Sequence, residues 1–116
     1  MNVIDSCGWL AYFAGERNAE IFSAPIENVE ELIIPTICLH EVFKVLQREA
    51  SEDVAFEAVA AMQQGVVVDL DVELSLESAV ISTREKLALA DAVIYSIALK
   101  YQADLWTQDK HFEGKT

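Results

Sequence analysis

The chain has 116 residues, of which 53% are hydrophobic, and its 20 acidic against 8 basic residues give a net charge of −12. This length predicts one domain, residues 1–116, and the hydrophobic fraction excludes a disordered chain. No apolar run has transmembrane length and no targeting signal is recognisable, so the cytoplasm is the expected location, without a membrane partner. The acidic charge excludes passive binding to nucleic acid through a basic face; it suits a protein that collects cations or has a basic partner.

Four short apolar runs predict strands, at residues 3–4, 32–34, 66–68 and 103–107. Between them, apolar residues at helical spacing predict helices in pairs, near residues 9–13, 19–24, 37–50, 54–64, 73–86 and 88–99. Pro25 is expected to end the second of these helices. In the helix near residues 73–86, the expected apolar stripe is Leu74, Leu76, Ala79, Val80 and Leu87. Strands that alternate with helices predict an α/β fold with a parallel central sheet and helices on both faces.

Four acidic residues stand out by their place in this pattern. Asp5 ends the first strand, Asp109 follows the last, Glu41 lies in the helix after the second strand, and Asp91 begins an almost wholly apolar helix. We expect all four at one edge of the sheet, because the carboxyl ends of parallel strands meet there. Each acid taken alone also has a structural interpretation; Asp5, for example, is a good helix N-cap.

The joint placement of these acids predicts a metal site. Converging carboxylates without matching bases repel one another and raise one another's pKa. A hard divalent cation bound between them removes the cost of this repulsion. Mg²⁺ or Mn²⁺ is the expected ion, because both prefer oxygen ligands and keep several waters. Two such ions are able to clamp the attacking and leaving oxygens of a phosphodiester.

The motifs, in their order, resemble those of a PIN domain, and the nearest type is the VapC-like toxin of bacterial and archaeal toxin–antitoxin pairs. The resemblance covers essentially the whole chain and is carried by Val3–Ser6, Thr36 with Glu41, Leu89–Ala92 and Leu105–Phe112. It implies a Mg²⁺- or Mn²⁺-dependent endoribonuclease that hydrolyses RNA phosphodiester bonds with a metal-activated water. The implied site has a catalytic, metal-binding acidic quartet and two hydroxyl residues that line the pocket: Asp5, Glu41, Asp91 and Asp109, with Ser6 and Thr107.

The resemblance also implies a sheet of order 3-2-1-4-5 with the first strand central. The chain ends soon after its Asp-x-x-Phe motif, so the fifth strand is expected to be short or absent. The implied partners are an antitoxin, received on apolar surface around Trp9, Tyr12 and Phe13, and a second copy in a homodimer. The alternatives are a PIN nuclease of RNA processing or decay that acts without an antitoxin, and an inactive PIN-like binding module.

Other residues keep two interpretations. Lys44 and Arg48 share a helix face with Glu41, and they either hold RNA phosphates or form an ordinary solvated face. Lys86 and Lys110 are further candidates for RNA contacts. The two histidines, His40 and His111, lack zinc-motif spacing and are expected to be solvated or core residues, and both cysteines are expected to be reduced core residues.

Overall fold

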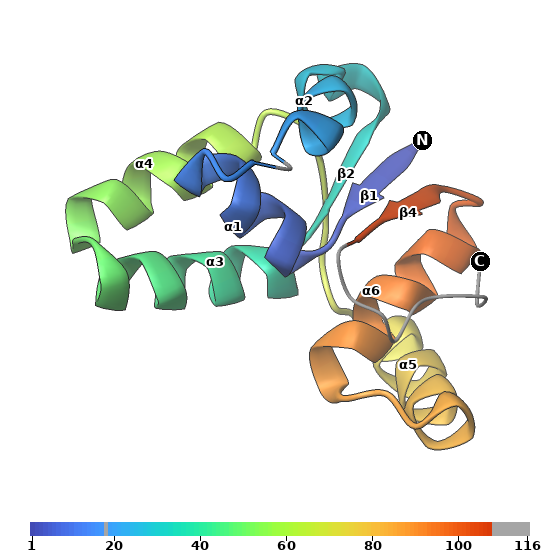
Figure 1. The fold of residues 1–116 in the computed structure, drawn as a ribbon. Coiled ribbons are helices and arrows are strands. Elements are labelled where there is room, and N and C mark those ends of the chain that lie inside the picture. Colours follow the sequence, from blue (N-terminus) through green and yellow to red (C-terminus); the bar gives the residue numbers. More distant parts are fainter. Residues whose placement is uncertain (18, 108–116) are drawn as a thin grey trace.

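The computed structural model describes residues 1–17 and 19–107. Within them, four strands form one parallel sheet of order β3-β2-β1-β4 (Figure 1). The strands are β1 (Asn2–Ile4), β2 (Leu32–Pro35), β3 (Val66–Val68) and β4 (Asp104–Trp106). The predicted parallel sheet, with β1 flanked by β2 and β4, is confirmed. The expectation about a fifth strand falls on residues 108–116, which lie outside the described residues.

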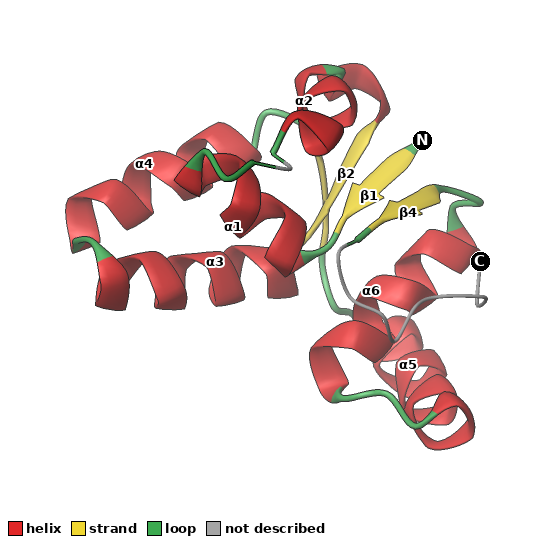
Figure 2. Ribbon diagram, in the orientation of Figure 1, coloured by secondary structure: helices red, strands yellow, loops and turns green. Residues whose placement is uncertain are grey.

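The helices of the described residues are α1 (Ser6–Ala14), α2 (Glu20–Glu27), α3 (Thr36–Glu49), α4 (Glu52–Met62), α5 (Val72–Glu85) and α6 (Leu89–Lys100), with a short 3₁₀ turn at Val29–Glu31. Figure 2 shows α1 to α4 on one side of the sheet and α5 with α6 on the other. From β1 to β3 the chain steps across the sheet in one direction, and it then returns past β1 to β4. Crossovers of one hand therefore place the last helix pair on the opposite face. None of the described helices is long and apolar enough to cross a membrane.

The core is built on the two central strands. Val3 and Ile4 of β1 and Ile33 and Ile34 of β2 are fully buried, because helices cover both faces of these strands. Helix α6 packs against β1, β2 and β4, and every residue from 92 to 98 is buried. An almost wholly apolar helix is expected to be buried, and the structure confirms this for α6.

Two local expectations are wrong. Pro25 does not end the second helix, which runs to Glu27, because Pro25 and Ile26 are buried in the core and the packing offsets the lost backbone hydrogen bond. In α5, Leu76 and Val80 are 66% and 60% exposed, although they were expected in the apolar stripe. The buried face of α5 instead contains Leu74, Ser78 and Ile81, the last within a small cluster that includes residues of α6.

Candidate active site

Asp5 stands between the end of β1 and the start of α1, and both of its carboxylate oxygens are held. Oδ1 accepts a hydrogen bond from the backbone N–H of Gly8 at 2.8 Å, and Oδ2 accepts one from the Thr107 hydroxyl. Asp5 is only 3% exposed, and a buried carboxylate requires such hydrogen bonds. Asp5 therefore caps helix α1, as the structural interpretation of the sequence predicts. Its side chain is also hydrogen-bonded to Thr107, in the chain that follows β4.

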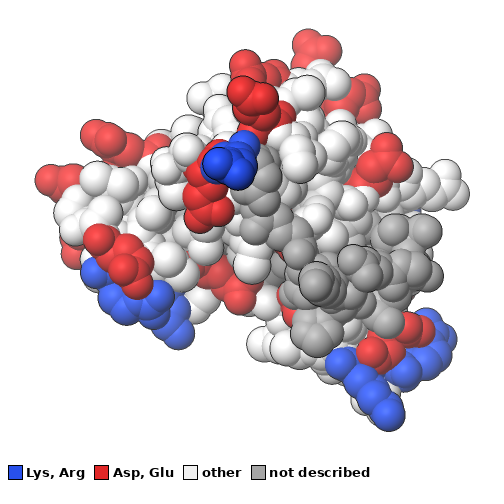
Figure 3. All heavy atoms as spheres, in the orientation of Figure 1, with Lys and Arg blue, Asp and Glu red and all other residues white. Residues whose placement is uncertain are grey.

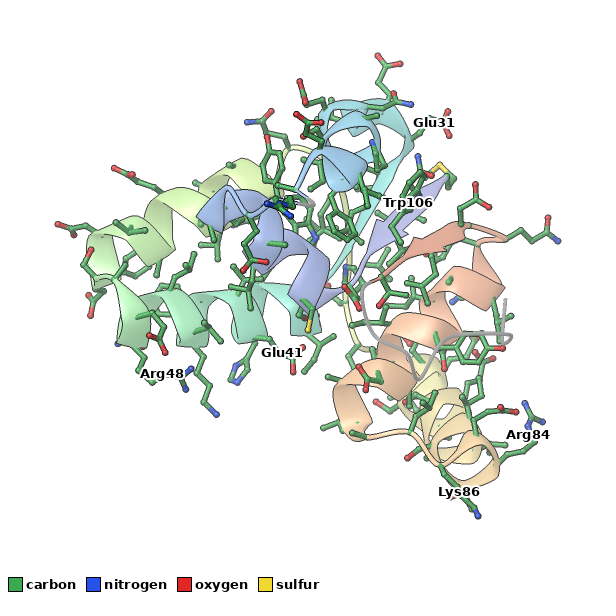
Figure 4. The ribbon with its side chains drawn as sticks, viewed as in Figure 1. Glu31, Glu41, Arg48, Arg84, Lys86 and Trp106 are labelled. Carbon is green, nitrogen blue, oxygen red and sulfur yellow. The ribbon has the colours of Figure 1, made fainter. Side chains whose placement is uncertain are left out.

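The pairing of β1 with β4 brings Thr107 to Asp5. Ile4 stands opposite Trp106, and the Asp5 N–H donates to the Trp106 carbonyl at 3.1 Å. The Trp106 Nε1–H donates to Asn2 Oδ1 at 2.9 Å, which fixes the same register through side chains (Figure 4). The chain after β4 therefore leaves the sheet beside the end of β1, where the sequence pattern places the candidate site.

Glu41 reaches this place from α3, the helix that follows β2. Its Oε1 accepts a hydrogen bond from the Ser6 hydroxyl at 2.5 Å. Ser6 is buried and Glu41 is half-buried, and Glu41 forms no ion pair with any residue in the described part of the chain. The hydrogen bond links the start of α1 to α3 and holds Glu41 against Ser6, the residue that follows Asp5 in the chain.

Cys38 lies beneath this network, close enough to be affected by both acids. Its thiol contacts the Ile4 carbonyl at 3.8 Å. Burial, and in smaller part the negative charges of Glu41 and Asp5, raise the pKa of the Cys38 thiol to about 12, although a hydrogen bond with Ser6 acts in the opposite direction. Cys38 therefore stays a neutral thiol at ordinary pH and is not a nucleophile.

The two cysteines differ in exposure. Cys38 is buried as expected, but Cys7 is exposed, because it lies on the outer side of the first turn of α1. We expect a maleimide at neutral pH to label one thiol of the folded protein, and two after unfolding in guanidinium. Mass spectrometry of the Cys7→Ser variant checks the assignment: rapid labelling of that variant in the folded state would contradict the burial of Cys38.

The other two acids of the predicted quartet are placed less directly. Asp91 is half-buried in the first turn of α6. The residues just before it, 88–90, line a cleft of about 460 Å³ together with Glu41, so the start of α6 faces the Glu41 end of α3 (Figure 4). Asp109 lies outside the described residues. In residues 1–17 and 19–107, no three His, Cys, Asp or Glu side chains are placed to share one metal ion.

The basic candidates fall into two groups. Lys44 and Arg48 line the same cleft as Glu41. Lys86 lies at the end of α5 and does not line this cleft. Figure 3 shows basic side chains over α3, over the end of α5 and near α1 and α2, with acidic side chains in scattered groups on the rest of this face. His40 is exposed, as one of its two expectations has it, and it too lines the cleft. Lys110 and His111 lie outside the described residues.

Solved structures that share this fold include toxins and toxin–antitoxin complexes. A toxin–antitoxin complex from Klebsiella pneumoniae matches with a TM-score of 0.81 at 22% identity, over 98% of this chain and 92% of that one. VapC20 of Mycobacterium tuberculosis, a toxin that cleaves the sarcin–ricin loop, matches with a TM-score of 0.83 at 15% identity, over 99% of this chain and 95% of that one. VapBC2 from Rickettsia felis, bound to a DNA fragment from its promoter, matches with a TM-score of 0.75 at 12% identity, over 97% of this chain and 90% of that one.

The identities are too low for these structures to show more than the fold. No curated protein matches the chain by sequence. A family model described as PIN domain, however, matches residues 3–115, which is nearly the full chain. With the sheet order, the helices and the Asp5–Thr107 contact already in place, the match has a plain consequence: the chain belongs to the PIN domain family.

Proposed function

We propose that the protein is a Mg²⁺- or Mn²⁺-dependent endoribonuclease and the toxin of a toxin–antitoxin pair. One observation carries the proposal: Asp5, Ser6, Glu41 and Thr107 meet at the end of β1, through the Ser6–Glu41 and Thr107–Asp5 hydrogen bonds. Membership of the PIN domain family and the likeness of the fold to toxin–antitoxin structures support it.

The donor set at this place fits a hard divalent cation. The groups that converge are carboxylate and hydroxyl oxygens, and the nearest sulfur, that of Cys38, is a buried neutral thiol. Asp5 and Glu41 would hold the ion together with Asp109 and with Asp91, which would have to move toward them, because no three acids of the described residues are already placed to share one ion. Each oxygen of Asp5 has a second lone pair beyond the hydrogen bond that it accepts. When bound, the metal would supply positive charge for a phosphate and lower the pKa of a water.

The chain's own residues have defined tasks in this scheme. The Gly8 N–H and the Thr107 hydroxyl fix both oxygens of Asp5, so the carboxylate cannot rotate. The Ser6 hydroxyl orients Glu41. Fixed carboxylates cost little reorganisation when a cation or a phosphate arrives, which is the basis of preorganised electrostatic catalysis.

A direct test incubates the purified protein with single-stranded RNA in Mg²⁺, in Mn²⁺ and in EDTA. Cleavage that requires the metal supports the proposal, and isothermal titration of Mn²⁺ gives the number of ions bound. A protein that binds neither Mn²⁺ nor Mg²⁺ and leaves RNA intact is the inactive PIN-like module instead.

An antitoxin partner would fit the surface of the first helices. Trp9, Tyr12 and Phe13 line a cavity of about 320 Å³ that also reaches α2 and α4. Trp9 is 2% exposed, and its Nε1–H has no hydrogen-bond partner in the described residues. A buried donor without an acceptor is costly, and a backbone carbonyl of a bound segment would satisfy it only if the residues that cover this atom move on binding. The net charge of −12 favours a partner with basic residues.

Replacing Phe13 by Ala should weaken this complex by at least about tenfold, because an aromatic anchor at an interface contributes more than about 1.4 kcal/mol. The measurement is co-expression with the product of the adjacent reading frame, followed by purification on a tag and titration. Leu99→Ala, on the other side of the sheet and 50% exposed, is the control and should bind normally.

The same experiment separates the proposal from its alternative. A protein that purifies without a partner, and whose RNA cleavage that neighbour does not change, is a nuclease of RNA processing or decay. Light scattering of the purified protein tests the proposed homodimer.

A further inference from the structure

The cleft beside Glu41 has two walls of different chemistry. One wall is a face of α3, from Ile37 through Glu41 and Lys44 to Arg48, and the other is the start of α6, residues 88–90. Its volume of about 460 Å³ lies within the range of small-ligand sites. Because Glu41 belongs both to the cleft and to the Ser6 network, any group in the cleft lies directly next to the candidate catalytic acids.

The α3 wall is unusual in so acidic a protein, because its cations are available to a ligand. Lys44 is exposed and forms no ion pair within the described residues. Arg48 pairs only with its sequence neighbour Glu49, at 3.1 Å, and both side chains are about two-thirds exposed, so that pair is weak. His40 lies one turn before Lys44 and adds ring N–H groups to the same wall.

The α6 wall adds a helix N-terminus to the cleft. Its N-cap residue, Ala88, provides no side-chain hydrogen bond to the first turn. The helix dipole is positive at this end, and the carboxylate of Asp91 in the same turn offsets part of that charge. Leu89 is 66% exposed and lines the cleft, which adds an exposed apolar surface to the same site.

We propose that this cleft binds the ribonucleotide next to the cleaved bond. Its phosphate lies between Lys44, Arg48 and the start of α6, and its base lies on Leu89, within reach of His40. Single-stranded RNA is the occupant that fits, because it joins a regular negative charge to flat apolar rings. The proposal rests on the proposed function and adds to it the subsite that selects the nucleotide.

The chain supplies a matched pair of arginines for the test. Arg48 and Arg84 are each 65% exposed, each lies in the last turn of its helix and each pairs with the following glutamate, but only Arg48 lines the cleft. Binding of fluorescein-labelled single-stranded RNA of mixed sequence is measured with Ca²⁺ in place of Mg²⁺. Arg48→Ala and Lys44→Ala should each raise Kd about fivefold and lower the salt slope by about 0.7, the value for one phosphate contact on a single strand. Arg84→Ala should change neither quantity.

A second pair tests the apolar floor. Leu89→Asp should weaken RNA binding about tenfold, and it should change which sequence of a randomised RNA is cut in Mg²⁺. Ile21→Asp, at a 57% exposed position of α2, is its control and should bind as the wild type does. Melting curves of all variants confirm that these exposed positions leave the fold intact.

The outcomes separate this inference from the proposed function. RNA that is cleaved normally, but bound equally by wild type, Arg48→Ala and Leu89→Asp, overturns the cleft and leaves the nuclease. If RNA binds through the cleft but is never cleaved, the inference about the cleft is supported and the proposed nuclease activity is wrong. Equal losses in Arg48→Ala and Arg84→Ala overturn the cleft, because they reflect overall charge alone. If the wild type binds no RNA but binds an acidic peptide through Arg48, the assignment to a nucleotide is wrong.

Discussion

Replacing Asp5 by Asn should reduce metal-dependent RNA cleavage by at least about 10²-fold, while the protein stays folded. The fold is preserved because Asn is also a good N-cap and its carbonyl still accepts from the Gly8 N–H. Its amide meets the Thr107 hydroxyl, which accepts as well as donates. What disappears is one negative charge, and with it a ligand for the cation. The measurement is the initial rate of cleavage, with Mn²⁺ affinity by titration as a second readout.

Asp71 offers a matched control, because it plays the same capping role elsewhere. It accepts from the Leu74 N–H at 2.8 Å, the same distance at which Asp5 accepts from Gly8, and it stands before α5. Asp71→Asn should cleave RNA and bind Mn²⁺ as the wild type does. Without metal, Asp5→Asn should melt at an equal or higher temperature, because it removes repulsion between Asp5 and Glu41. Normal cleavage by Asp5→Asn would show that Asp5 is a cap and nothing more.

The sheet was predictable from the sequence because its strands are buried on both faces. Val3–Ile4 and Ile33–Ile34 are continuous apolar runs, which is the pattern of a parallel sheet covered by helices. Helix α5 was predictable in extent but not in orientation. Leu74, Leu76 and Val80 are all apolar, and only packing against α6 decides that Leu74 is buried and the other two are exposed. Amphipathic periodicity fails where the exposed side is as apolar as the buried one.

The candidate site was predictable in part for a different reason. A residue at the end of a parallel strand has a known place, so the position of Asp5 follows from strand position alone, whereas Thr107 was expected at the site from the resemblance to PIN domains. The Ser6–Glu41 hydrogen bond does not, because it depends on how α3 rotates about its axis after β2. His40 carries no signal in the sequence either. It is exposed and lacks any motif, and only the approach of α6 turns its helix face into the wall of a cleft.

Replacing Gly8 by Ala should lower stability by about 2 kcal/mol and reduce cleavage as well. A Cβ built at Gly8 lies 2.8 Å from Ile4 Cγ2 and 2.8 Å from Phe22 Cε1. Both neighbours are buried core residues, so neither moves away at low cost. For a domain of this size, the melting temperature should fall by about 5–10 °C. The first turn of α1 must shift, and the Gly8 N–H that holds Asp5 Oδ1 shifts with it.

Gly15→Ala distinguishes this coupling from a loss of stability alone. Gly15 ends α1 with a φ of 65°, and a Cβ there meets nothing within 4 Å. Alanine at that position costs about 1 kcal/mol of backbone strain and touches no residue of the site. Measured well below both melting temperatures, Gly15→Ala should cleave RNA at the wild-type rate and Gly8→Ala should not. Equal rates for the two variants would mean that the position of Asp5 does not depend on Gly8. Because Phe22 supplies one of the two close contacts, Phe22→Leu should cost less stability in the Gly8→Ala background than in the wild type, since the added methyl group occupies part of the space that the ring leaves.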